Sequence, residues 1–299
     1  RSIFEKHGIT IAYDSPTNQQ FVVLSEREIK EFFNDKTDVV YIPAGRSMIT
    51  LLSNQMNYIY SSMDDIQKRN MDYCTRSYLE KILQMKSVFT ISPVEMLNDV
   101  IAMTYIKIDE ERAKESISLM KQLLRGEYIN KDGEERLQVS NNRYVKLNYA
   151  SSGQQEVVWI LNVLFYYLLN GESTYFIIEE PESHLFPNSQ KLVMEFIALV
   201  CNGNGNQLFL TTHSPYILGT INNLLYADKV SRNVDKSELN RIISKNKWLN
   251  FDKVNAIFVQ NGKIKSCLDK EFKSIENEVI DGASEQINED YDKMLELKG

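Results

Sequence analysis

The feature that most constrains the fold is an alternation of short apolar runs and helical segments in the second half of the chain. The runs "TYFIIE" (174–179) and "NQLFLTT" (206–212) are typical of buried strands, and the amphipathic segment "NSQKLVMEFIALVCNG" lies between them. A further helical segment, "SPYILGTINNLL", follows the second run. Because strands that alternate with helices favour a parallel sheet with helices on its faces, we expect an α/β fold.

The first half of the chain changes character near residue 48. The runs "ITIAYD", "QFVVLS" and "DVVYIPA" read as strands, the last of them stopped by Pro43. From about Met48 to Glu127 the pattern is helical, and "SPVEML" predicts a capping box with Ser92 as N-cap and Glu95 at the third helical position. We therefore predict one domain built from residues 1–47 and 136–299, interrupted by a helical insertion over residues 48–135.

Three more segments of the second half have clear local signals. The runs "RLQV" and "RYVKLN" predict a hairpin around Asn141-Asn142. The segment "SSGQQEVVWILNVLFYYLLNG" predicts a helix that opens at Ser-Ser-Gly and closes at Gly171. The run "VNAIFVQNGKIKSC" predicts a hairpin with an Asn-Gly turn, followed by a charged C-terminal helix.

Composition narrows the class of protein. The chain has 299 residues, of which 43% are apolar and 25% charged, so it can build a sizeable core. Its net charge of −7 argues against a surface given over to nucleic acid. Arg241, Lys245 and Lys247 have two interpretations, a local basic patch or a solvated helix face, and the second is the simpler. Three cysteines without metal-like spacing indicate a reducing cytoplasm, and no apolar run approaches the roughly 20 residues of a membrane span.

Polar side chains follow both apolar runs where we expect each strand to end. Glu179 and Glu180 come at the end of the first run, and Thr211, Thr212 and His213 end the second. Ligands of an open α/β sheet bind outside the carboxyl ends of the strands. Neighbouring side chains of a strand point to opposite faces, so two adjacent glutamates can approach one site only where the pleat ends. Taken alone, the glutamates are explained equally well by an acidic turn.

A third polar cluster, Ser151-Ser152-Gly153, stands at a predicted helix start. Free backbone N–H groups and the positive end of the helix dipole suit a phosphate there, and a glycine lets the backbone approach closely. An ordinary N-cap is the simpler explanation when this cluster is considered alone.

The order of the three clusters resembles the C-terminal half of an ABC-type ATPase domain, more like the SMC, RecF and OLD-like ATPases than like transporters. In this resemblance "ASSGQQ" matches the signature motif, "YFIIEEPESHLFP" the Walker B strand and D-loop, and "LFLTTHSP" the strand with the switch histidine. The segment "VVYIPAGRS" also resembles one that these ATPases carry. The implied fold is a P-loop NTPase sheet of the ABC/SMC type, flanked by helices.

The resemblance implies roles for seven residues, with ATP and Mg²⁺ as cofactors. Glu179 would support the magnesium shell through water, Glu180 would orient the attacking water, and His213 would contact that water or the γ-phosphate. The signature residues would touch a nucleotide that a second protomer holds: Ser151, Ser152, Gly153 and Gln154. Glu179 departs from the usual Asp of this motif, but its longer side chain still reaches a hydrated metal.

The phosphate-cradling loop Gly-x-x-x-x-Gly-Lys-Ser/Thr does not occur in this sequence. Gly45-Arg46-Ser47 imitates its end, but Val40 stands five positions before Gly45 and arginine replaces lysine. In the family this loop lies near the N-terminus, so we expect it to precede Arg1 and expect the chain by itself to be inactive.

The function that we expect is ATP hydrolysis coupled to head-to-tail homodimerisation, driving a DNA-related or phage-defence effector such as a partner nuclease. One alternative is a scaffold that dimerises without hydrolysis. Another is a transporter subunit, against which the apolar helix after the signature argues. Two further residues have two interpretations each. His184 either makes a contact across the dimer or lies in a surface turn. Arg46 either contacts phosphate or forms a salt bridge, and the salt bridge is the better explanation.

Overall fold

The structure of this protein is a computed structural model that describes residues 37–46, 50, 61–64, 72–103, 108–276 and 278–297. In the last helix, the side chains are described from residue 287 onward. The expected strands "ITIAYD" and "QFVVLS" lie outside the described residues. Residues 38–299 form one compact unit, and everything below concerns that unit.

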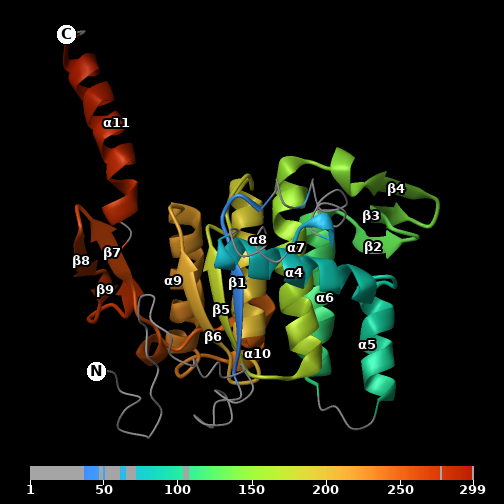
Figure 1. Cartoon of the computed structure of the whole chain (residues 1–299). Coiled ribbons are helices and arrows are strands. Elements are labelled where there is room, and N and C mark those ends of the chain that lie inside the picture. Colours follow the sequence, from blue (N-terminus) through green and yellow to red (C-terminus); the bar gives the residue numbers. More distant parts are fainter. Residues whose placement is uncertain are drawn as a thin grey trace, which may run out of the picture. The chain divides into compact units, whose positions relative to one another are not determined.

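The described part of the central sheet consists of parallel strands in the order β1 (Asp38–Ile42), β5 (Thr174–Glu179) and β6 (Gln207–Thr211) (Figure 1). Ile42 lies opposite Ile178, and Glu179 lies opposite Thr211. All three strands therefore end at one edge, which confirms the expected parallel arrangement of these segments. That edge brings together the polar residues that follow each strand.

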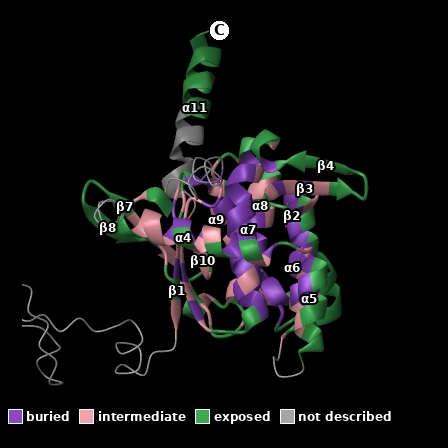
Figure 2. Ribbon diagram, turned by 45° about the vertical axis from the view of Figure 1, so that its right-hand side comes forward, coloured by how far each residue is buried: buried purple, intermediate pink, exposed green. Residues whose placement is uncertain are grey.

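Helices bury one face of this sheet. Phe176 and Ile178 are fully buried under α7 (Ser152–Asn170), where the Tyr167 ring meets the Phe176 ring edge-on at 5.8 Å. Helix α7 is buried along nearly its whole length, and α8 (Pro187–Cys201) packs against it in the same core (Figure 2). The other face carries exposed Val39 and Phe209. The prediction that the β6 segment is buried is wrong, since the sheet's covered face reaches only its alternate residues.

The ends of the central helices follow local sequence signals. Ser151 caps the start of α7, and Gly171 ends it in the left-handed conformation with a φ of 71°, as predicted. Helix α9 (Pro215–Val230) begins after the N-cap Ser214, whose hydroxyl accepts the N–H groups of residues 216 and 217. Each signal involves residues within about one helical turn, so sequence alone is enough to locate it.

In the described stretches before β2 (Glu127–Lys131), the helices with printed bounds are α4 (Tyr73–Val88), α5 (Pro93–Ala102) and α6 (Glu110–Leu124). The predicted capping box at the start of α5 is present, with Ser92 accepting the Glu95 N–H and the Glu95 carboxylate accepting the Ser92 N–H. Buried residues of α4, α5 and α6 join the same hydrophobic core as α7 and α8. The extent of the helical insertion stays a prediction.

An antiparallel meander follows, made of β2 (Glu127–Lys131), β3 (Glu134–Ser140) and β4 (Arg143–Lys146). The hairpin at Asn141-Asn142 is confirmed, but strands resume at Glu127 and not at Arg136 as expected. The predicted boundary between residues 135 and 136 falls inside β3. Asp132-Gly133, with φ angles of 53° and 78°, is the hairpin signal that would have located β2.

One short element, η2 (Leu147–Tyr149), directly precedes α7. After α9 come further short elements and then one long helix, α11 (Glu278–Leu297). The short elements are α10 (Lys236–Ile242), η3 (Lys245–Lys247), η4 (Phe251–Lys253), β7 (Ile257–Gln260), β8 (Lys263–Ser266), β9 (Leu268–Asp269) and β10 (Ser274–Ile275). The predicted Asn-Gly turn joins β7 to β8, with Asn261 and Gly262 both at positive φ. The charged C-terminal helix is confirmed as α11.

The interpretation of Arg241, Lys245 and Lys247 as a solvated face holds for Arg241 and Lys245, which are exposed, and is wrong for Lys247. Lys247 is buried, and its Nζ lies 2.8 Å from Glu195 Oε2 and 3.2 Å from Glu115 Oε1. A buried ammonium needs such partners, because leaving water without them is costly. These ion pairs hold η3 against α6 and α8.

Among the described helices, none has the length and apolar character of a membrane-spanning segment.

Candidate functional site

The carboxyl edge of the sheet gathers side chains from β1, β5 and β6. The Glu179 carboxylate, at the end of β5, accepts a hydrogen bond from the Ala44 N–H through Oε2 at 3.1 Å. Burial raises the pKa of Tyr41 well above its ordinary value, and hydrogen bonding to Glu179 and the charge of that carboxylate raise it further. The Glu179 side chain thus links the end of β5 to the segment that follows β1.

Glu180 leaves the strand in a left-handed backbone conformation, with a φ of 42°. A non-glycine residue adopts that conformation at a cost of about 1–2 kcal/mol. Its N–H donates to the Thr211 carbonyl at 3.0 Å, and its carbonyl accepts the Ser183 N–H at 3.1 Å. The turn takes the side chain out of the strand's alternation, so that Glu180 Oε1 lies 3.2 Å from His213 Nε2. The Glu180 side chain is 37% exposed and that of His213 83% exposed, so solvent reaches the pair.

Glu182 fastens the turn after β5 to the segment after β6. Its Oε1 accepts the Thr212 hydroxyl at 2.6 Å and the His213 N–H at 2.7 Å. Its Oε2 is buried and has no hydrogen-bond partner. No role was expected for Glu182 from the sequence, although its place as the third carboxylate in the same cluster was a signal. Glu182 fixes the backbone from which the His213 side chain projects.

Arg46 contacts the main chain of the same turn. It is fully buried, and its Nε lies 3.2 Å from Glu156 Oε2, which bears out the expected salt bridge. Its Nη1 donates to the Glu179 carbonyl at 2.7 Å, and its Nη2 donates to the Glu180 carbonyl at 2.9 Å. These carbonyl contacts could not be predicted from the order of residues, because they join segments far apart in the chain.

The predicted signature residues form the first turn of α7. Ser151 Oγ accepts the Gln154 N–H at 3.3 Å, and Gln154 Oε1 accepts the Ser151 N–H at 3.0 Å, which completes a capping box. Gln154 Nε2 also donates to the Leu124 carbonyl at 2.6 Å, so this amide bridges to the end of α6. Ser151 and Ser152 are exposed. The role of all three in nucleotide binding stays a prediction.

Gly153 is buried against the turn that follows β5. A Cβ at this position would lie 2.8 Å from the His184 carbonyl oxygen and 3.1 Å from Leu185 Cδ2. Packing within the chain therefore requires glycine here, independently of any phosphate. The same contact places the start of α7 beside the predicted D-loop. His184 itself is exposed and has a φ of 59°.

The Glu179 carboxylate suits a magnesium ion that it contacts through water. Carboxylate oxygens are donors that Mg²⁺ prefers, and this ion usually keeps several of its waters. Among the described residues, no group of three or more His, Cys, Asp or Glu side chains is arranged to hold a metal ion directly. Glu179 already accepts the Ala44 N–H, so contact through water suits it better than direct coordination.

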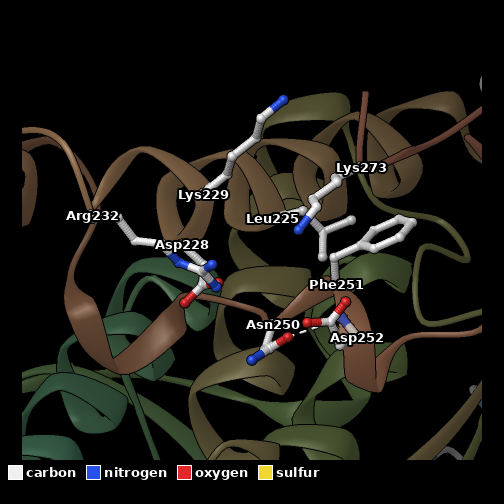
Figure 3. Close-up of a pocket in the computed structure, with 8 residues that line it drawn as sticks. All are labelled: Leu225, Asp228, Lys229, Arg232, Asn250, Phe251, Asp252 and Lys273. Atoms are coloured by element: carbon white, nitrogen blue, oxygen red, sulfur yellow. Dashed lines mark hydrogen bonds and ion pairs between the residues drawn. The ribbon is translucent and has the colours of Figure 1, made fainter. Parts of the chain in front are cut away.

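A separate cavity of about 120 Å³ lies beside the C-terminal half of α9 (Figure 3). Its lining residues are Leu225, Asp228, Lys229, Arg232, Asn250, Phe251, Asp252 and Lys273. None of the predicted site residues is among them. Ligand pockets usually measure about 300–1,000 Å³, so this small cavity does not compete with the strand edge as the candidate site.

Comparison with known proteins gives a family match over most of the chain. None of the curated proteins matches the chain. A family model described as an AAA ATPase domain matches residues 15–218, which is more than half of the chain. The matched region contains β1, the Ser151 turn, Glu179 and Glu180 at the end of β5, and His213. The chain belongs to the AAA ATPase domain family.

Proposed function

We propose that this chain is the ATP-binding and ATP-hydrolysing domain of an SMC/OLD-like ATPase, with Glu180 and His213 as the residues that act on the attacking water and the γ-phosphate. The observation that carries the proposal is the 3.2 Å approach of their side chains at the carboxyl edge of the sheet. Family membership supports nucleotide hydrolysis in general, and this pair supplies the chemical groups for it.

Phosphoryl transfer needs little covalent help from a protein, because positioning and charge stabilisation supply most of the catalysis. In the proposed mechanism the Glu180 carboxylate accepts a hydrogen bond from the attacking water. This orients the water so that a lone pair of the water oxygen faces the γ-phosphorus. His213 donates a hydrogen bond to a γ-phosphate oxygen. Glu179 would hold Mg²⁺ through water, and the bound ion would neutralise charge on the phosphates.

We further propose that ATP joins two copies of the chain head to tail. The exposed hydroxyls of Ser151 and Ser152 stand at the start of α7, where free N–H groups and the helix dipole favour a phosphate from a partner. Hydrolysis would remove that phosphate and reopen the pair. Such a cycle is suited to driving a DNA-related or phage-defence effector, with a nuclease as a candidate partner.

The alternative is a dimerisation scaffold that does not hydrolyse ATP. It is favoured by the lack of a Gly-x-x-x-x-Gly-Lys-Ser/Thr loop in residues 1–299, which also leads us to expect weak ATP binding by these residues alone. Calorimetric titration of residues 1–299 with ATP tests that point, and micromolar affinity would contradict it.

The deciding experiment uses the product of the complete gene. Phosphate release and molar mass by light scattering would be measured with ATP and Mg²⁺, and with ADP and Mg²⁺ as the control. Hydrolysis together with an ATP-specific dimer supports the proposal. A dimer without hydrolysis selects the scaffold, and a monomer without hydrolysis rejects both.

A further inference from the structure

We propose that Arg46 is a positioning residue that holds the Glu180 backbone so that the Glu180 carboxylate faces His213. The inference rests on the proposed function, in which that carboxylate directs water. Arg46 does not contact the carboxylate itself. It acts through the two main-chain carbonyls that flank the turn at Glu180.

The first step of the argument is the geometry of the guanidinium. Nη1 donates to the Glu179 carbonyl at 2.7 Å and to the Pro43 carbonyl at 2.7 Å, while Nη2 donates to the Glu180 carbonyl at 2.9 Å. Successive carbonyls of an extended strand point in opposite directions, so they cannot meet one planar group. Here the two carbonyls converge on Arg46 because Glu180 has a φ of 42°. The guanidinium therefore matches the left-handed turn and not an extended continuation of β5.

The second step concerns how Arg46 is itself held. Its Nε donates to the Glu156 carbonyl at 3.2 Å and lies 3.2 Å from Glu156 Oε2, and both side chains are almost completely buried. Glu156 belongs to the first turns of α7, whose start carries Ser151 and Ser152. Arg46 thus connects the helix start that is proposed to meet a partner's nucleotide with the turn that is proposed to direct water.

The third step excludes a simple requirement for positive charge. A lysine ammonium is a compact point charge, whereas a guanidinium presents donors in a rigid planar fork. A lysine at position 46 could pair with Glu156 but could not span the carbonyls of both Glu179 and Glu180. If Arg46 acts by position, Arg46→Lys should keep the fold and lose the alignment of Glu180.

The test compares two variants of the full-length protein. Arg46→Lys retains the charge, and Arg46→Met with Glu156→Met removes the buried ion pair without leaving either charge unpaired. The control is Lys86→Met with Glu135→Met, which removes another buried ion pair, one between α4 and β3. Circular dichroism and thermal unfolding establish that each variant is folded.

The main readout does not depend on ATP hydrolysis. The chain has three histidines, so the imidazole signals of His213 can be assigned in isotope-edited NMR spectra with His184→Asn and His213→Asn. In both Arg46 variants we expect the His213 signals to move toward their positions in Glu180→Ala, and we expect no movement in the control. Unchanged His213 signals in the folded Arg46 variants would overturn the inference.

Steady-state kinetics then test whether the position of the Glu180 carboxylate matters for ATP hydrolysis. We expect Arg46→Lys to lower kcat for ATP at least tenfold, on the order of the loss for a misplaced catalytic group, while KM changes less than about threefold. An equal kcat in a folded Arg46→Lys would overturn the catalytic part of the inference. Should the wild-type protein fail to hydrolyse ATP, the proposed function fails, and the NMR comparison still decides whether Arg46 positions Glu180.

Discussion

Glu180 and His213 follow neighbouring parallel strands, and their side chains meet 3.2 Å apart at the edge where those strands end. Neither strand by itself creates this contact. Glu180 is directed by its left-handed backbone, and the main chain at His213 is held by the Glu182 carboxylate at 2.7 Å. The pair is therefore the product of two turns that the sheet brings together and that the Glu182 carboxylate joins to each other.

Replacing Glu180 by glutamine is expected to abolish most ATP hydrolysis while preserving ATP binding. The amide keeps the shape of the side chain but is a much weaker acceptor for the proton of an attacking water, and general-base groups contribute about 10²–10⁴-fold. We expect phosphate release to fall by at least a hundredfold and an ATP-bound dimer to accumulate, measured by light scattering. Unchanged turnover would remove Glu180 from the mechanism.

Replacing Glu182 by alanine is expected to reduce both stability and turnover. The change leaves the Thr212 hydroxyl and the His213 N–H without their acceptor, and hydrogen bonds to charged groups contribute about 1.5–3 kcal/mol. We expect the free energy of unfolding to fall by about 2 kcal/mol in urea denaturation, and kcat to fall more than KM rises. Glu172→Ala, in the exposed loop before β5, is the control, and equal effects of the two changes would contradict the role of Glu182.

Two glycine-to-alanine changes in helices are expected to have opposite effects. At Gly153 the new Cβ would lie 2.8 Å from the His184 carbonyl oxygen, and overpacking of this kind costs about 1–3 kcal/mol. At Gly219, within α9, nothing lies within 4 Å of the new Cβ, so alanine should stabilise the helix by about 0.5–1 kcal/mol. Thermal unfolding of both variants provides the comparison, and stabilisation by Gly153→Ala would refute the close packing of α7 on the turn.

Cys201 is expected to be inert toward alkylation in the native protein. Burial raises the pKa of its thiol to about 12, from an ordinary value of 9.0. Because the thiolate is the reactive form, iodoacetamide at pH 8 should modify Cys201 at least about a hundredfold more slowly in the folded than in the unfolded chain. Site-resolved mass spectrometry measures both rates, and rapid native labelling would contradict the raised pKa of this thiol.

The same shift has a consequence for stability. A thiol whose pKa is raised on folding contributes stability below pH 9, where both states are protonated at sulfur. As the pH rises from 9 toward 12, the unfolded thiol loses its proton while the folded one keeps it, so this contribution declines. Cys201→Ala should therefore show a flatter decline in unfolding free energy over that range, measured by denaturation at successive pH values.

The sequence by itself determined the features that arise within a few residues of chain. The capping box of Ser92 and Glu95, the N-cap at Ser214, the left-handed end of α7 at Gly171 and the Asn261-Gly262 turn each depend on neighbours in sequence. The β2–β3 hairpin was equally accessible through Asp132-Gly133. The order of apolar runs also indicated the parallel sheet, so the edge that carries Glu179, Glu180 and His213 could be predicted.

Only the tertiary structure decided what those residues contact. Arg46 meets the carbonyls of Glu179 and Glu180, and Lys247 is buried between Glu115 and Glu195. Each contact joins segments far apart in the chain, and no pattern of neighbouring residues encodes it. The physical reason is burial: a charged group that packing removes from water must find partners among whatever groups the fold brings near, and that choice exists only once the helices and strands have packed together.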